Sequence, residues 1–145
     1  METVKFKIIE DGDPAARGFP PVQGNGDWID LCARARVSLD FLCPAKVRLG
    51  VAIQLPKGYE AMLCLRSSSP DKYKIIQMNA PGIIDEAYCG DEDELILSVF
   101  SFGMEVIPSG ARIAQLRIFP KQNVKLEEVE FLGNPNRGGF GSTGI

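Results

Sequence analysis

The expected fold rests on nine residues, Val47-Arg48-Leu49-Gly50-Val51-Ala52-Ile53-Gln54-Leu55. Every odd-numbered position of this run is apolar, while Arg48 and Gln54 stand at even positions. A strand has this period of two when one face packs against a core and the other does not. Similar alternation occurs in Val4–Ile8, Tyr59–Leu65 and Arg112–Phe119, and Leu95–Phe102 is rich in β-branched and aromatic residues.

Turn signals separate these runs, at Pro56-Lys57-Gly58, Asn79–Gly82 and Pro108–Gly110. With 15 Gly and 10 Pro in 145 residues, the chain has little room for long helices. Helical spacing competes only in Asp30–Leu42, and a short helix fits Pro70–Tyr73. Many short strands joined by turns predict an all-β domain, which could be a sandwich, a barrel or a jelly roll.

We expect one β domain, residues 1–132, followed by a C-terminal arm, residues 133–145. A chain of 145 residues has the usual length of a single domain and is long enough to bury a core. The final segment is rich in glycine and has almost nothing to bury, so we expect it to be mobile.

Composition and charge narrow the class of protein. A net charge of −3 and a pI near 5.0 do not favour non-specific binding of nucleic acid, although local arginines can still hold a small phosphorylated ligand. No apolar run is long enough to cross a bilayer, and the N-terminus lacks the pattern of a signal peptide. We therefore expect a cytoplasmic protein that contacts neither nucleic acid nor membrane.

The sequence contains no histidine. This excludes Ser-His and Cys-His nucleophiles and a histidine general base. The cysteines form no C-x-x-C pair, and a zinc site would need four thiolates at scattered spacings. Reduced, buried thiols are the expected state of these four residues: Cys32, Cys43, Cys64 and Cys89.

The segment most suited to chemistry is Asn79-Ala80-Pro81-Gly82-Ile83-Ile84-Asp85-Glu86-Ala87-Tyr88-Cys89-Gly90. Proline and glycine constrain its entrance and Gly90 constrains its exit. Asp85 therefore lies on a hairpin-like element that can aim a carboxylate accurately. Tyr88, three residues later, can form a flat wall beside Asp85. A surface hairpin with a solvated acid is the alternative interpretation.

Two further segments carry groups that can bind phosphate. Arg66-Ser67-Ser68-Ser69 directly follows an apolar strand and offers a guanidinium, hydroxyls and free backbone N–H groups. The alternative is an ordinary serine-rich turn. Gln115 is a polar residue inside an otherwise apolar strand, and its alternative role is a glutamine that faces solvent.

The C-terminal run Arg137-Gly138-Gly139-Phe140-Gly141-Ser142-Thr143-Gly144 places glycines on both sides of one aromatic residue. Such a flap can lay Phe140 over a flat ligand, while Ser142 and Thr143 offer hydroxyls and N–H groups to anions. A disordered tail has a similar glycine content. Near the N-terminus, Asp30 lies in an apolar, strand-like setting and needs a partner such as an arginine or a metal-bound water.

Together these segments provide a base, an aromatic wall, two phosphate cradles, a metal-facing acid and a flap, which suits hydrolysis of a nucleotide polyphosphate. In this order they resemble the five motifs of the homotrimeric dUTPase family (dUTP pyrophosphatases), from about Gly26 to the C-terminus. The most specific matches are N-A-P-G-I-I-D-E-A-Y-C-G and G-G-F-G-S-T-G, and R-I-A-Q-L and R-S-S support them.

The resemblance implies an all-β jelly-roll, β-clip fold that forms a homotrimer, with each active site drawing on all three subunits. It also implies hydrolysis of dUTP to dUMP and pyrophosphate. Asp85 would activate the water that attacks the α-phosphorus. Tyr88 would pack under the deoxyribose and exclude a 2′-hydroxyl, and Asn79 with the backbone from Gly82 to Ile84 would read the uracil edge.

For the phosphates, the resemblance implies that Arg66, Ser67 and Ser68 bind them from a neighbouring subunit and that Gln115 binds near the α-phosphate. Asp30 matches the acid of the first motif, which contacts the magnesium site through water. Mg²⁺ would bridge the triphosphate oxygens and neutralise their charge.

In the arm, Phe140 and Gly141 would close over the base, with Ser142 and Thr143 on the terminal phosphates. The family's fifth motif has its arginine five residues before the aromatic residue. Here that position is Pro135, and Arg137 lies closer to Phe140. We expect Arg137 to reach the γ-phosphate from this shifted position.

Two other functions fit the same resemblance. A dCTP deaminase of the same superfamily shares the core, but the glutamate motif of those enzymes is absent here. A dUTP-binding regulatory protein would use the nucleotide to order the tail and control a protein partner.

Overall fold

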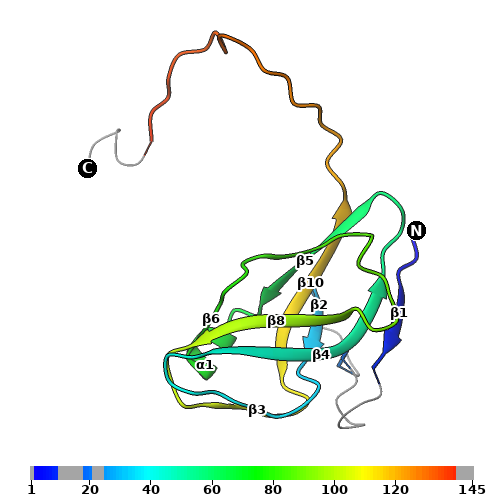
Figure 1. Cartoon of the computed structure of the whole chain (residues 1–145), viewed down its shortest axis with the longest axis vertical. Helices are drawn as coiled ribbons and strands as arrows, with labels where there is room; N and C mark the ends of the chain where they lie inside the picture. The colour runs from blue at the N-terminus through cyan, green and yellow to red at the C-terminus, as the bar shows by residue number, and fades with distance from the viewer. Residues whose placement is uncertain (1, 10–17, 21–24, 140–145) are drawn as a thin grey trace.

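The computed structural model describes residues 2–9, 18–20 and 25–139. The elements form two four-stranded sheets and one two-stranded sheet (Figure 1). The first sheet has the order β1 (Lys5–Ile8), β4 (Pro44–Gln54), β8 (Glu94–Ser101) and β6 (Ile75–Gln77).

The second sheet has the order β2 (Ile29–Cys32), β10 (Arg112–Pro120), β5 (Tyr59–Leu65) and β7 (Gly82–Ile84). The small sheet pairs β3 (Val37–Ser38) with β9 (Val106–Ile107), and the pairings in all three sheets are antiparallel. The helix of the described residues is α1 (Ser69–Tyr73). The predicted all-β architecture is confirmed.

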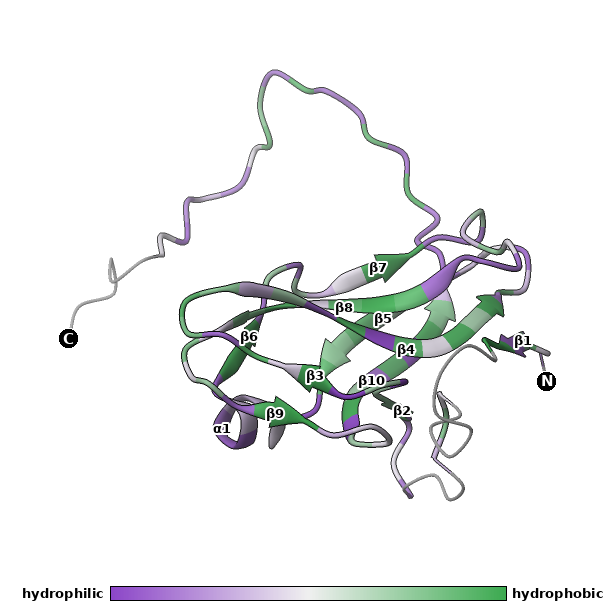
Figure 2. Ribbon diagram, turned by 60° about the horizontal axis from the view of Figure 1, so that its bottom comes forward, coloured by the Kyte–Doolittle hydropathy of each residue, from purple (hydrophilic) through white to green (hydrophobic). Residues whose placement is uncertain are grey.

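One hydrophobic cluster joins the two large sheets. It is drawn from the inward positions of both, including Val47, Leu97 and Val99 on the first sheet and Leu63 and Leu116 on the second. Figure 2 shows the apolar residues concentrated along these strands. In the four long strands β4, β5, β8 and β10, the inward face therefore follows the alternation that the sequence carries.

The helical alternative for Asp30–Leu42 is wrong, whereas the short helix predicted at Pro70–Tyr73 is confirmed as α1. β2 begins the first of these segments, and its Leu31 pairs with Ala114 of β10. Because contacts with β10 and the turn before it accompany complete burial of Leu31 and Ala33, tertiary contacts override the helical spacing. α1 ends at Lys74, whose φ of 51° is left-handed.

β4 contains a bulge that leaves its alternation intact. Arg48 pairs with Ile96 and Ala52 with Glu94, so four steps along β4 match two along β8. An excess of two residues keeps the odd-numbered positions in phase, and Val47, Leu49, Val51 and Ile53 are all buried. Gly50, with φ of 68°, supplies the left-handed backbone that the bulge requires.

β10 ends at Pro120, and residues 121–139 contain neither helix nor strand. This segment runs away from the sheets (Figure 1) and exposes several large apolar side chains: Val124, Leu126, Val129, Phe131 and Leu132. The division of the chain at residue 132 remains a prediction. Within the described residues, no helix has the length and hydrophobicity to cross a membrane.

Candidate active site

Gln77, the last residue of β6, attaches the start of the Asp85 segment to β5. The Gln77 amide oxygen accepts a hydrogen bond from the Leu65 N–H (3.0 Å), and its Nε2 donates to the carbonyls of Leu63 (2.9 Å) and Asn79 (2.6 Å). β7 then pairs with β5, with Gly82 opposite Leu63 and Ile84 opposite Ala61. The hairpin is therefore attached to β5 before the chain reaches Asp85.

Asp85 lies in a compact turn. Its Oδ1 accepts a hydrogen bond from the Ala87 N–H (2.8 Å), and its carbonyl accepts one from the Tyr88 N–H (3.1 Å). Glu86 anchors the turn, because its carboxylate accepts the Gly58 N–H (2.6 Å) and pairs with Lys121 Nζ (3.2 Å). The Gly58 hydrogen bond, assisted by Lys121, lowers the pKa of Glu86. Asp85 itself is exposed, so its carboxylate is available to a ligand.

A cavity of 170 Å³ lies beside this turn, between β7 and the start of β8. It is smaller than the roughly 300–1,000 Å³ of a drug-sized pocket, so it can take part of a nucleotide rather than the whole molecule. Four residues singled out from the sequence line it together: Asn79, Gly82, Ile84 and Tyr88. Leu63, Ile83, Glu94, Leu95 and Ile96 complete the lining.

Tyr88 is held in place at the rim of this cavity. Its hydroxyl donates a hydrogen bond to the Glu94 carbonyl (2.9 Å), while 40% of the residue stays exposed. Burial raises the pKa of the Tyr88 hydroxyl, and the nearby Asp93 and Glu94 carboxylates raise it further. The ring therefore forms a fixed, neutral wall at neutral pH.

A second group of polar residues lies around Asp30. The Asp30 carboxylate is nearly buried and pairs with Arg66 Nε (3.0 Å) and Arg112 Nη1 (3.5 Å). Gln115 stands directly opposite Asp30 on one side and Cys64 on the other, and its Nε2 donates to the Leu65 carbonyl (3.3 Å). Arg112, the first residue of R-I-A-Q-L, begins β10 just after the Pro108–Gly110 turn, and the sequence predicted no role for it.

The Arg66–Ser69 loop is attached to β10 by its backbone. The Arg66 N–H donates to the Ile113 carbonyl (3.1 Å), and so does the Ser69 hydroxyl (3.1 Å). Ser67 and Ser68 remain exposed, and Ser68 makes no side-chain capping hydrogen bond to α1. A cavity of 380 Å³ opens here, lined by the cations of Arg66, Lys72 and Arg112 together with Ser68 and Ser109 among others. Such a cavity suits a polyanion.

The two groups lie on opposite faces of the second sheet. Gly82 and Ile84 share the inward register of Leu63, whereas Asp30 and Gln115 share the outward register of Cys64. Asp85 follows the residue paired with Ala61, and Arg66 follows Leu65. Asp85 therefore lies level with the position just before Ala61 on β5, and Arg66 lies six residues further along. Six residues of extended chain span about 20 Å, so Asp85 and Arg66 of one chain do not reach the same phosphorus atom.

The remaining predicted residues belong to the arm. Arg137 is exposed, in a stretch without regular structure. Phe140, Gly141, Ser142 and Thr143 lie outside the described residues.

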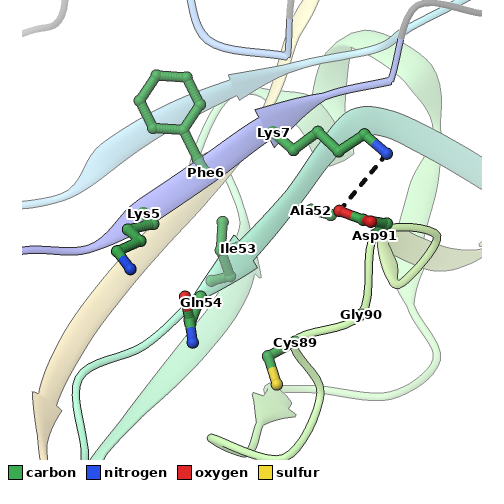
Figure 3. Close-up of a pocket in the computed structure, with 9 residues that line it drawn as sticks. All are labelled: Lys5, Phe6, Lys7, Ala52, Ile53, Gln54, Cys89, Gly90 and Asp91. Atoms are coloured by element: carbon green, nitrogen blue, oxygen red, sulfur yellow. Dashed lines mark ion pairs between the residues drawn. The ribbon is translucent and has the colours of Figure 1, made fainter.

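The four cysteines are free thiols, as predicted, but the expectation that they are buried holds only in part. Cys32 is buried and Cys64 is half-buried, whereas Cys43 and Cys89 are exposed. Burial raises the pKa of both Cys32 and Cys64. Cys89 lies in a different hollow, of 140 Å³, between β1, β4 and the loop that follows Tyr88 (Figure 3).

These differences in exposure and pKa predict which cysteines iodoacetamide alkylates first at pH 8. The thiolate is the reacting form, so Cys89 will be alkylated well before Cys32 and Cys64, whose raised pKa values and burial keep them protonated and covered. Peptide mass spectrometry over a time course measures the order. Denaturant should abolish it, and faster labelling of Cys32 than of Cys89 in the folded protein would contradict the structure.

Comparison with known proteins identifies the family. The dUTPase family model matches residues 28–144. The prophage-derived deoxyuridine 5′-triphosphate nucleotidohydrolase YosS of Bacillus subtilis (strain 168) is 46% identical over 120 residues, covering 82% of this chain and 84% of that protein. The deoxyuridine 5′-triphosphate nucleotidohydrolase of Hydrogenobaculum sp. is 44% identical, covering 100% of this chain and 99% of that one.

Two solved structures share the fold. A mutant Staphylococcus bacteriophage 80alpha dUTPase with dUpNHpp has a TM-score of 0.79 at 22% identity, with both chains covered completely. A mutant dUTPase from phage phi11 of S. aureus, described with a structural Mg(II) ion, has a TM-score of 0.73 at 20% identity, covering 92% of this chain and 100% of that one. From the family model and these close relatives in sequence, the chain belongs to the dUTPase family.

Proposed function

We propose that the chain hydrolyses dUTP to dUMP and pyrophosphate, with Asp85 as the base that activates the attacking water. The observation that supports this most strongly is the cavity shared by Asn79, Gly82, Ile84 and Tyr88, with the Asp85 turn directly after β7. It provides a small pocket for a nucleoside and an exposed carboxylate beside it.

In the proposed reaction, Asp85 accepts a proton from a water molecule as the water oxygen attacks the α-phosphorus. The bond from the α-phosphorus to its bridging oxygen breaks, and pyrophosphate leaves. A carboxylate is a weak base, so most of the rate comes from holding water and phosphorus in line and from neutralising charge. The hydrogen bond from the Ala87 N–H limits the orientations open to the Asp85 carboxylate.

The residues that line the cavity select the nucleoside. The Tyr88 ring packs against the sugar and leaves no room for a 2′-hydroxyl, because its own hydroxyl is tied to the Glu94 carbonyl. Asn79 and the backbone from Gly82 to Ile84 read the uracil edge. In the part of the chain that the structure describes, β7 pairs with β5 along one edge, so its other edge keeps backbone groups available for hydrogen bonds to a base.

In this proposal the phosphates bind to the polar residues around Asp30, which are Arg66, Ser67, Ser68 and Gln115. Arg112 joins them, because it pairs with Asp30 and lines the same cavity as Arg66. Both Asp30 carboxylate oxygens already pair with arginines, so direct coordination of a metal by Asp30 is disfavoured. This arrangement fits a magnesium ion that Asp30 contacts only through water. The described residues contain no group of three or more Cys, Asp or Glu that could hold a metal ion, so bound Mg²⁺ would depend on water and on the substrate phosphates for most of its ligands. When bound, it neutralises charge on the triphosphate oxygens.

The proposal requires more than one chain at each site, since about 20 Å of β5 separates Asp85 from Arg66. We therefore include a homotrimer in the proposal. A neighbouring chain supplies the phosphate-binding residues, and the arm of a further chain supplies Arg137, Phe140, Gly141, Ser142 and Thr143. The protein's location in this proposal is the cytoplasm, where exposed thiols such as Cys43 and Cys89 stay reduced.

An apolar surface beside Asn79 supports contact between copies. On the outer side of the first sheet, Phe100 lies between Pro44 and Ile76 in register, and Phe102 packs edge-on against Phe100 with ring centroids 5.4 Å apart. Ile76, Met78 and Phe102 are each about half exposed, and a hollow of 430 Å³ runs from Pro44 and Met78 to Asn79. An exposed apolar area of this kind marks an interaction surface.

Pyrophosphate release tests the reaction. We expect rapid release from dUTP, with much slower release from UTP, dTTP and dCTP, and loss of activity when EDTA removes Mg²⁺. Ammonia release from dCTP would instead indicate a deaminase. Stable binding of dUTP without pyrophosphate release would indicate a regulatory protein.

Replacement of the base tests the role of Asp85. Asp85→Asn keeps the shape of the turn and removes the basic oxygen, so turnover should fall by about 10²–10⁴-fold while a non-hydrolysable dUTP analogue still binds. Steady-state kinetics and calorimetry measure the two quantities. Asp91→Asn, an exposed acid in the following loop, is the matched control and should keep wild-type turnover. Near-normal hydrolysis by Asp85→Asn would exclude this role.

Mixed trimers test the sharing of sites. Asp85→Asn and Arg66→Gln should each be inactive, but refolding an equimolar mixture should restore about one quarter of the wild-type rate, because one site in four combines intact Asp85 and Arg66 from different chains. A mixture of Asp85→Asn with Tyr88→Ala should restore nothing, since one chain supplies both residues. Equal activity of the two mixtures would show that the sites are not shared.

A further inference from the structure

Glu94, the first residue of β8, lines the cavity beside Tyr88, and its side chain is a buried carboxylate. Its residue is 4% exposed, and each of its oxygens has a cationic partner. Oε1 lies 3.2 Å from Arg34 Nε, and Oε2 lies 2.7 Å from Arg48 Nη1. A carboxylate removed from water in this way is stable only while its charge is matched.

The same carboxylate closes the bulge of β4. Its Oε1 accepts a hydrogen bond from the Gly50 N–H (2.8 Å), which the bulge removes from the β4–β8 ladder. The Gly50 carbonyl accepts the Ile9 N–H (2.9 Å), and the Arg48 carbonyl accepts the Arg34 N–H (2.8 Å). The Glu94 side chain therefore fixes where β8 begins relative to β4.

The backbone of Glu94 faces the nucleoside cavity. Its carbonyl accepts the Tyr88 hydroxyl, and the residue itself lines the cavity together with Tyr88. Between the two residues, the chain turns at Gly90, whose N–H donates to Asp93 Oδ2 (2.6 Å). The Tyr88 hydroxyl is thus held by the Glu94 carbonyl. The position of that carbonyl depends in turn on Arg34 and Arg48, which pair with the Glu94 side chain.

We propose that Glu94 is a positioning residue for Tyr88 and that, through the Tyr88–Glu94 hydrogen bond, it sets the preference for a 2′-deoxy sugar. The proposal rests on the proposed dUTP hydrolysis and adds a determinant of selectivity behind the cavity wall. Loss of the Glu94 charge removes the acid 3.2 Å from Arg34 Nε, on a side chain that is only 11% exposed, and the start of β8 shifts with its carbonyl. The ring then moves and admits a 2′-hydroxyl.

The test compares kcat/KM for dUTP with kcat/KM for UTP in single and double variants. Glu94→Gln should lower the dUTP/UTP ratio by roughly tenfold, and Tyr88→Phe, which lacks the donor hydroxyl, should lower it similarly. In the double variant the ratio should fall no further, because both changes break one connection. A purely structural effect of Glu94 would reduce kcat/KM for both nucleotides equally and leave the ratio unchanged, which would overturn the proposal, as would additive effects.

Arg48 provides a variant that preserves the fold. Its side chain is 57% exposed, so Arg48→Met leaves the Arg34 and Gly50 contacts of Glu94 in place and should still lower the ratio, while Arg48→Lys should restore it. These two variants decide the question if Glu94→Gln does not fold. An unchanged ratio in Arg48→Met would also count against the proposal.

The surface pair Lys7–Asp91, 3.6 Å apart, supplies a matched control on the same loop (Figure 3). Lys7→Ala should leave the ratio at the wild-type value, and a fall as large as that of Glu94→Gln would overturn the role of Glu94. The wild-type assay distinguishes failure of the proposed function from failure of the role of Glu94. A wild type that does not prefer dUTP would refute the proposed function, whereas a selective wild type with selective variants would refute only this inference.

Discussion

The pairing of β5 with β7 on one side and β10 on the other is the constraint on which the site depends. β7 is held opposite Ala61–Leu63, and β10 is held opposite the whole of β5. An extended strand has a fixed rise per residue, so these pairings place the Asp85 turn and the Arg66 loop at opposite ends of one rigid rod. The same pairings set the facing of each group, inward for the nucleoside cavity and outward for the phosphate cluster.

Two buried carboxylates hold the ends of this arrangement, and each uses two arginines. Asp30 of β2, in the second sheet, pairs with Arg66 and Arg112, and Glu94 of β8, in the first sheet, pairs with Arg34 and Arg48. A buried ion pair adds little net stability compared with an apolar contact, but breaking it is costly because a charge is left uncompensated. Such groups therefore specify geometry: Asp30 orients cations toward a ligand, whereas Glu94 secures backbone at the cavity.

The loops between these pairs connect them. The Arg34 carbonyl accepts a hydrogen bond from the Ser109 hydroxyl (3.3 Å), and the Ala33 carbonyl accepts the Gly110 N–H (2.8 Å). Arg112 follows this turn after one further residue, Ala111. Arg34, one of the two arginines that pair with Glu94, thus belongs to a segment that also contacts the turn before β10, so the two groups share one framework even though they face different ligands.

The sequence by itself determined the strands with strong alternation, since burial of one face leaves a period of two that local composition reveals. Val47–Leu55 matches β4 up to its last residue, Gln54, Arg112–Phe119 falls within β10, and Tyr59–Leu65 coincides with β5. It also determined the chemistry on offer, because Asp85, Tyr88 and Arg66 carry their functional groups in any fold. The short helix at Pro70–Tyr73 followed from local signals alone.

Only the tertiary structure decided which of these groups meet. Asp30–Leu42 is extended because β10 supplies a partner that helical spacing does not show, and Gln77, Arg112 and Glu94 matter through residues distant in the chain. Asn79 and Tyr88 share a cavity, while Asp85 and Arg66 lie apart, because strand register converts sequence separation into position in space. Register depends on contacts between distant segments, and no single segment contains that information.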